Sequence, residues 1–173
     1  MICSILFLPL LLCLQAYAQV EAAPAKAVEF VKSFYDWYAP WSQTDRNGTN
    51  FQRAIKRNPS IFSVELRSGL LSDFAAQSKV SGAIVGIDFD PFLNSQDPAG
   101  QYKIGNVTKQ GDRYLFHLHA VIDGVGQRKP ALTAEVEQQV RGWVFVNFHY
   151  PETSDLLSTL RELRESRSKK RGR

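Results

Sequence analysis

Apolar side chains recur at three- and four-residue steps early in the chain, a spacing typical of an amphipathic helix. The first such stretch covers 25–38, and Pro24 suits the first turn of a helix. The polar residues of the stretch fall elsewhere on the helical wheel. The pattern therefore predicts a helix over 25–38. Its inward stripe comprises Val28, Val31, Phe34, Tyr35 and Tyr38.

Two further helical stretches are predicted before the middle of the chain. A polar segment can carry a short helix near 51–56. A longer helix then runs to about residue 78, with Asn58 or Ser60 as its N-cap. Gly69 lies inside it and weakens it by roughly 1 kcal/mol relative to alanine. Its expected apolar face comprises Ile61, Val64, Leu70, Leu71 and Phe74.

The second half of the chain alternates apolar and polar residues, which indicates strands. Strands are predicted at 102–109, 113–122, 131–140 and 142–150, joined by short turns. In the second strand, the residues expected to face inward are Tyr114, Phe116, Leu118, Ala120 and Ile122. In the third, they are Leu132, Ala134, Val136 and Val140, with Glu135 among those facing outward.

A last helix is predicted at 153–165, capped by Thr153 or Ser154 and carrying a stripe of leucines. The element order predicts an α+β fold. A curved antiparallel sheet of about four strands packs against N-terminal helices, and a C-terminal helix follows. Short hairpin connections exclude a doubly wound parallel sheet.

The N-terminus has the pattern of a signal peptide over 1–18. An apolar run ends at Ala16-Tyr17-Ala18, and it is shorter than the roughly 20 residues that span a membrane. Both cysteines, Cys3 and Cys13, lie inside this segment, so thiol chemistry is excluded from the mature chain. We expect a single domain over 19–165, periplasmic or secreted after cleavage.

The positive charge is concentrated at the C-terminus. The chain has 21 basic and 17 acidic residues, and the last eight residues hold five of the basic ones and no acid. Without them the balance is 16 basic against 17 acidic residues. We therefore expect 166–173 to be a disordered basic tail that makes at most weak contact with anionic lipid. Nucleic acid is excluded as a partner of an exported chain.

Three segments carry a resemblance to a known family: "FVKSFYDWY", "IDFDPFLNSQD" and "GWVFVNFHYPETSDLLSTLREL". On these the chain resembles the bacterial exported family called domain of unknown function 3828, within the cystatin-like and nuclear-transport-factor-2-like group. The resemblance implies a curved antiparallel sheet wrapped against helices and an exported address, but no reaction. In that family the last strand more often carries an acid where this chain has Asn147 or His149.

An acidic segment, 85–98, places Asp88, Asp90 and Asp97 among apolar residues. Their oxygens suit a hard cation, but Pro91 and Phe92 fall where a calcium loop needs ligands and glycine. A ligand contact is a second interpretation. The favoured one is structural: carboxylates accept hydrogen bonds from buried backbone amides, which would otherwise cost about 1–3 kcal/mol each.

His117 and His119 share one face of a strand, and His149 could join them from a paired strand. Three imidazoles would suit zinc, but we favour a solvated or hydrogen-bonded face, and predict no metal and no cofactor. The aromatic residues of the first helix allow two interpretations, a packed core or a surface for a partner. They are Tyr35, Trp37, Tyr38 and Trp41.

The leading hypothesis is an exported, non-enzymatic binding or envelope-associated domain, with an inhibitor-like or immunity-like protein as its specific version. Its partner would be a protein or another envelope component, and the protein itself a monomer or small homo-oligomer. The alternative is a small cavity enzyme or small-ligand carrier of the cone-shaped fold. It would use Asp36, Asp88 or His117 as a base, and analogy of fold alone supports it.

Overall fold

The computed structural model describes residues 23–44, 50–151 and 155–171. The fold is α+β, as predicted, with N-terminal helices, an antiparallel sheet and a C-terminal helix. The predicted signal peptide, 1–18, lies outside the described residues. The elements are α1 (Ala25–Ser42), α2 (Asn50–Arg57), the 3-10 turn η1 (Pro59–Ile61), α3 (Val64–Gln77), β1 (Tyr102–Gln110), β2 (Arg113–Ile122), β3 (Val125–Gly126), β4 (Leu132–Gln139), β5 (Gly142–His149) and α4 (Leu156–Arg171).

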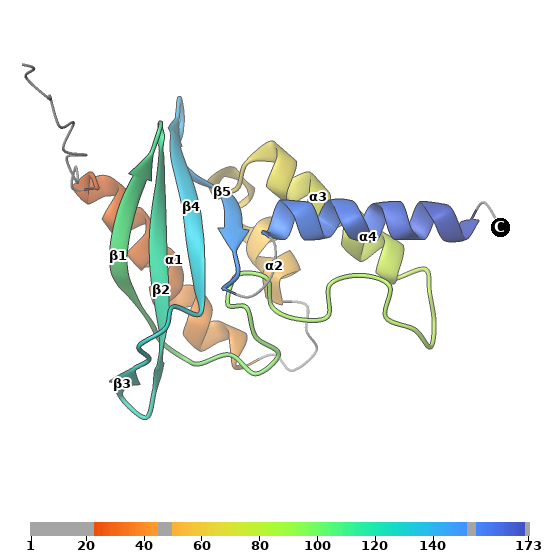
Figure 1. Ribbon diagram of the computed structural model, residues 1–173, viewed down its shortest axis with the longest axis horizontal. Helices are drawn as coiled ribbons and strands as arrows, with labels where there is room; N and C mark the ends of the chain where they lie inside the picture. Colours follow the sequence, from red (N-terminus) through yellow and green to blue (C-terminus); the bar gives the residue numbers. More distant parts are fainter. Residues whose placement is uncertain (1–22, 45–49, 152–154, 172–173) are drawn as a thin grey trace, which may run out of the picture.

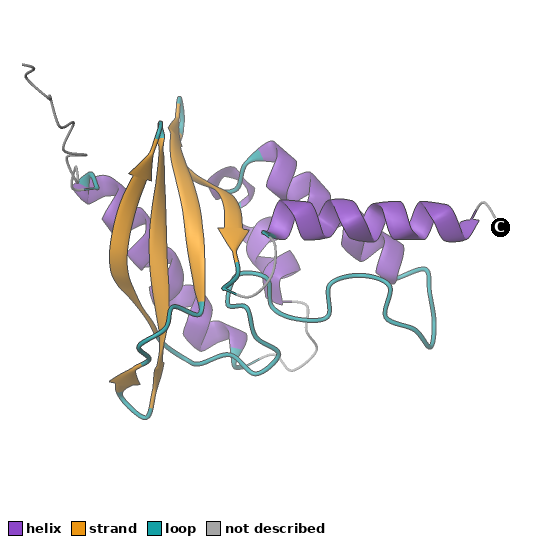
Figure 2. Ribbon diagram, in the orientation of Figure 1, coloured by secondary structure: helices purple, strands orange, loops and turns teal. Residues whose placement is uncertain are grey.

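The strands pair antiparallel in the order β1-β2-β4-β5, and the short β3 pairs with the end of β2. Figure 1 shows α1 lying across one face of this sheet, whereas α3 and α4 lie together beyond β5. Figure 2 shows the division between a sheet half and a helical half. All four predicted strands are confirmed, each with ends within two residues of the predicted ones.

The core is unusually rich in aromatic rings. Phe34, Tyr35 and Tyr38 of α1 are buried, which confirms the predicted inward stripe. At its centre, Phe92 is fully buried. Five ring centroids lie 5.0–6.5 Å from that of Phe92: those of Phe34, Tyr38, Phe51, Phe62 and Phe148. Edge-to-face and offset contacts of this kind add to the stabilisation that burial provides.

The predicted strand faces are confirmed in the middle of the strands and wrong at their ends. The inward residues Tyr114, Phe116, Leu118, Leu132, Ala134 and Val136 are buried. Ile122, however, is exposed, because Val121 is the buried residue where β3 joins β2. Val140 is also exposed, because β4 ends at Gln139 and Val140 lies in the turn.

Helix α1 continues to Ser42 instead of ending at residue 38. It includes Pro40, which cannot donate a backbone hydrogen bond. Close to the end of a helix this removes one bond only. Packing of Trp41 against Trp37 and Tyr38, with ring centroids 5.6 and 6.0 Å apart, offsets the loss.

The predicted caps of the longer helices are corrected. Ser63 caps α3, since its hydroxyl accepts a hydrogen bond from the Leu66 N–H at 3.2 Å. Asn58 instead accepts from the Ser60 hydroxyl before a 3-10 turn. The expected apolar face of α3 is also partly wrong, because Val64 is exposed at the first turn.

Helix α4 is capped by Asp155, whose carboxylate accepts from the Ser158 N–H at 3.0 Å and the Ser158 hydroxyl at 2.9 Å. A hydrogen bond from the Asn147 amide at 2.8 Å and the two bonds from Ser158 lower the pKa of Asp155 to about 2, although its partial desolvation acts in the opposite direction. The predicted capping residues Thr153 and Ser154 lie outside the described residues.

Helix α4 was expected to end at residue 165, but it continues to Arg171, so the described part of the predicted disordered tail is helical.

The extension of α4 is explained by one ion pair. Arg167 donates to the carboxylate of Asp73 on α3, and at 2.8 Å to the carbonyl of Val85 in the loop that follows α3. Asp73 is buried, and its other oxygen accepts from the Ile87 N–H at 2.8 Å. Gly86 is required here, because a Cβ at that position would lie 2.6 Å from the Asp73 carboxylate. Arg167 thus joins both helices and the loop.

Replacement of Arg167 tests whether the Asp73–Arg167 ion pair holds α4 to α3. Arg167→Ala leaves the buried Asp73 carboxylate without its cation, and we expect a loss of about 3 kcal/mol in the free energy of unfolding. Arg164→Ala, one turn earlier, is the matched control and should change stability by less than about 0.5 kcal/mol. Urea denaturation measures both. Equal stability of the two variants would show that the ion pair does not hold α4.

Candidate functional site

The acidic segment places four consecutive residues, Asp90–Leu93, inside the fold between α1 and the sheet. Four tyrosine hydroxyls donate one hydrogen bond each to these four residues. Tyr38 donates to the Asp90 carboxylate at 2.6 Å. The other three donate to main-chain carbonyls: Tyr150 to that of Pro91 (3.0 Å), Tyr35 to that of Phe92 (3.0 Å) and Tyr102 to that of Leu93 (3.2 Å). We call the four tyrosines the tyrosine cluster. Its members come from α1, from β1 and from the residue after β5, so three separate parts of the chain hold the segment in place.

Of the three aspartates in this segment, Asp90 is the one that is hydrogen-bonded inside the fold. Although the residue is only partly buried as a whole, its carboxylate points to the fully buried Tyr38. Its other oxygen accepts from the Phe92 N–H at 2.9 Å. Burial raises the pKa of Asp90 to about 6, and the hydrogen bonds from Tyr38 and Phe92 oppose part of that rise. Both carboxylate oxygens are therefore occupied by donors of the same chain.

The other two aspartates of the segment do not join Asp90. Asp88 and Asp97 are exposed. The Gln96 amide donates to Asp88 at 3.4 Å, and the N–H of Asp97 donates to the Ser95 hydroxyl. The structure thus separates the three acids, because only Asp90 meets a buried donor. A contact of Asp88 or Asp97 with a partner stays a prediction.

The tyrosine cluster is held in its protonated form. Desolvation raises the pKa of Tyr35, Tyr38, Tyr102 and Tyr150, and the negative charge of Asp90 raises all four further. Protonated hydroxyls are the donors that the carbonyls of the segment require. These tyrosines therefore act as structural donors and are not bases at neutral pH.

The four aromatic residues of α1 that were predicted as a possible partner surface do not lie in one place. Tyr35 and Tyr38 belong to the core. Trp37 and Trp41 are half-buried, and the guanidinium of Arg57 lies 5.1 Å from the centroid of the Trp37 ring. Trp37 and Trp41 remain available as partner contacts, but they form no continuous surface with the two tyrosines.

The predicted histidines lie on the sheet face opposite α1. His117 pairs in register with Thr133, and Thr133 with His149, so two strand spacings separate the histidines of β2 and β5. The His119 ring lies over Gly105 of β1, and its Nδ1 is 2.8 Å from the Gln127 carbonyl. Within the part of the chain that the structure describes, no three His, Cys, Asp or Glu side chains are grouped to hold a metal ion.

The same face contains a buried acid that the pattern placed in solvent. Glu135 is 7% exposed. Its carboxylate pairs with Arg113 of β2 and with His149 of β5, each at 2.7 Å. The alternation of apolar and polar residues in the sequence assigned Glu135 to the correct face of the sheet. It could not show that side chains of the neighbouring strands cover Glu135.

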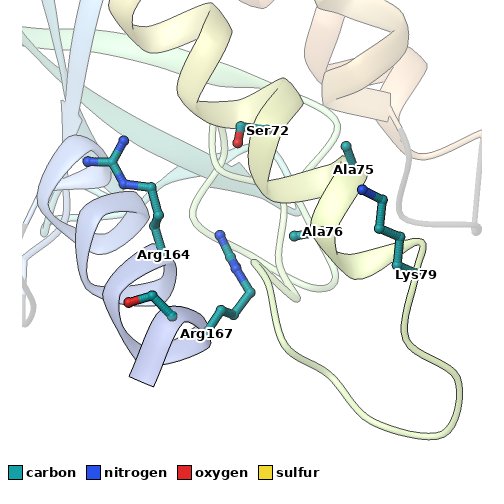
Figure 3. A pocket seen from close by; sticks show the side chains of 7 residues that line it. Ser72, Ala75, Ala76, Lys79, Arg164 and Arg167 are labelled. Carbon is teal, nitrogen blue, oxygen red and sulfur yellow. The ribbon is translucent and has the colours of Figure 1, made fainter. Parts of the chain in front are cut away.

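A groove between α3 and α4 forms a concave part of the described surface. Its larger hollow has a volume of about 500 Å³. It is lined by Ser72, Ala75, Ala76, Lys79, Arg164, Arg167 and Ser168 (Figure 3). A second hollow of about 300 Å³ shares Ser72, Arg164 and Arg167, and adds Arg161 and Glu65 among its lining residues. We call the two together the α3–α4 groove.

Small residues let the two helices of the groove approach closely, and cationic side chains give its lining a positive charge. Gly69 allows the helices to approach, since a Cβ there would lie 3.1 Å from Leu160. Arg167 is neutralised by Asp73, whereas Arg161, Arg164 and Lys79 make no ion pair within the described residues. Sequence reasoning missed this site, because the bases and the small residues come from helices that are about 90 residues apart.

No family model matches the sequence, and no curated protein or solved structure matches it either. Membership of the domain of unknown function 3828 family therefore stays a prediction. No helix among the described ranges is both long and apolar enough to cross a membrane.

The buried Asp90 predicts a pH dependence of stability. Its pKa is about 6 in the folded chain against 3.8 for the free side chain, so the folded state binds the proton more tightly. Its contribution is present in full below about pH 4 and is lost as the pH rises to about 6. The stability of the wild type relative to Asp90→Asn should fall by about 3 kcal/mol over that range. Urea denaturation between pH 3.5 and 8 measures it; a flat difference would contradict the assignment.

His119 and Gly105 predict a packing effect. A Cβ at residue 105 would lie 2.5 Å from Nε2 of His119, so Gly105→Ala must displace the ring from the Gln127 carbonyl. We expect a loss of about 1–3 kcal/mol in unfolding free energy. Gly126→Ala is the matched control, since nothing lies within 4 Å of its Cβ position. If thermal denaturation shows equal losses, His119 is not packed as described.

Proposed function

We propose that the protein is an exported, non-enzymatic binding domain of the bacterial envelope, and that it holds its partner at the α3–α4 groove. One observation carries the proposal. Three cationic side chains, Arg161, Arg164 and Lys79, line a concave surface without an ion-pair partner among the described residues. A surface of this kind attracts an anionic partner and becomes weaker as salt screens it.

The charge of α4 adds to this attraction. The helix has six basic residues and two acidic ones, a net charge of +4. The larger hollow has no acidic residue in its lining, and the acid in the smaller one is Glu65. The partner that fits best therefore presents carboxylate or phosphate groups, as an acidic protein or an anionic envelope component does. An inhibitor-like or immunity-like role is the specific form of this proposal.

The alternative, a cavity enzyme or small-ligand carrier, draws less support from the geometry. It requires a buried acid that reaches a bound molecule. The Asp90 carboxylate points inward, but donors of its own chain occupy both of its oxygens. Phe92 and the rings around it fill the space where the cone-shaped alternative would need a cavity. Asp36, another candidate base, pairs with Lys32 on the surface of α1.

Binding to envelope membranes tests the proposal. The mature chain is mixed with total envelope membranes, proteins included, and the bound fraction is measured by sedimentation. Arg161→Ala/Arg164→Ala should weaken binding at least about tenfold, since each cation near an anionic surface contributes about 1 kcal/mol. Raised salt should weaken the wild type in the same way.

The control variant is Arg128→Ala/Lys129→Ala, which removes two exposed cations between β3 and β4 and keeps the same net charge as the test variant. It should bind as the wild type does. Equal loss in both variants would mean that total charge acts and not the groove. Unchanged binding of the groove variant would refute the proposed site.

A further inference from the structure

The loop after α3 exposes apolar side chains. Val80 is 40% exposed and Ile84 is 70% exposed, although both are bulky aliphatic residues. Exposed aliphatic residues are common singly, but two on one loop tip call for an explanation. In Figure 1 this loop extends from the end of α3 below the C-terminal half of α4.

The tip is held away from the core by its base. The Gln77 side chain accepts from the N–H groups of Val85 and Gly86 at 2.7 and 2.9 Å, and donates to the Ala83 carbonyl at 3.1 Å. Arg167 of α4 donates to the Val85 carbonyl at 2.8 Å. These bonds fix the base of the loop to both helices, so the two aliphatic side chains are presented outward at a fixed place.

Cations lie at the start of the loop and on the neighbouring helix α4. Lys79 belongs to the loop and lines the same hollow as Arg164, and Figure 3 shows Lys79 at the start of the loop and Arg164 across the hollow on α4. Lys169 is exposed on the last turns of α4, beyond the Arg167 that touches the loop. Aliphatic residues and bases therefore occupy one end of the molecule. The large sheet and β3 lie at the other end (Figure 1).

We propose that this end docks on an anionic phospholipid bilayer, with Val80 and Ile84 entering the interface and the bases of α4 and Lys79 contacting lipid phosphates. This inference rests on the proposed function, and it names the partner as the membrane surface. Peripheral proteins bind anionic membranes by this combination of inserted apolar groups and nearby cations.

The size of the tip favours lipid over protein. A stable protein interface buries about 800 Å² on each partner, with a central apolar cluster. Two aliphatic side chains on a narrow loop offer far less. A bilayer needs no complementary shape, because the headgroups move apart around the inserted side chains.

Vesicles of defined composition test the inference. The full mature chain is sedimented with phosphatidylglycerol–phosphatidylcholine vesicles and with phosphatidylcholine vesicles alone. We expect binding to the anionic vesicles only, and weaker binding as salt is raised. Val80→Ser/Ile84→Ser should reduce the affinity about tenfold or more, since both apolar side chains would be lost from the interface.

Val125→Ser is the matched control, because Val125 is 65% exposed on β3, away from the loop. It should bind as the wild type does, and circular dichroism checks that each variant is folded. Failure of the wild type to bind anionic vesicles, or unchanged binding of the loop variant, overturns the inference. If the wild type fails with pure lipid but binds envelope membranes through Arg161 and Arg164, the proposed function stands and its partner is a protein or another anionic envelope component. If it binds neither, both fail.

Discussion

Four consecutive residues, Asp90–Leu93, lie inside the core, where a carbonyl or carboxylate without a donor would destabilise the fold. The tyrosine cluster supplies those donors from α1, from β1 and from the residue after β5. The same segment carries Phe92, which contacts rings from helix and sheet alike. The rest of the structure depends on this insertion, since it joins the helix layer to the sheet layer by polar and apolar contacts at once.

This insertion has a consequence for function. A carboxylate inside an apolar fold is often a sign of catalysis. Here burial raises the pKa of Asp90, and both carboxylate oxygens accept hydrogen bonds within the fold, from Tyr38 and from the Phe92 N–H. The α3–α4 groove lies on the surface, at the opposite end from β3. There the Asp73–Arg167 pair ties α4 to α3, and the neighbouring bases remain unpaired by acids of the described chain.

Much of the fold could be predicted from local pattern. The strands β1, β2, β4 and β5 follow an alternation that any half-buried strand shows. The errors lie at the ends of elements, where alternation no longer decides. Pro40 did not end α1, because Trp41 packs on the rings of Trp37 and Tyr38 one turn earlier. The basic residues after 165 did not end α4, because Arg167 pairs with the distant Asp73.

The site was less predictable, for a related reason. Asp88, Asp90 and Asp97 are alike in sequence context, yet only Asp90 meets a buried hydroxyl, and that hydroxyl is 52 residues away. Glu135 and the α3–α4 groove were missed because no local pattern records which strand or helix covers a side chain. The sequence by itself determined the kinds of elements, their order and their apolar faces, since these follow from spacing along one segment. Only the tertiary structure decided which polar groups are buried, paired or left free, since that depends on donors and charges brought from distant parts of the chain.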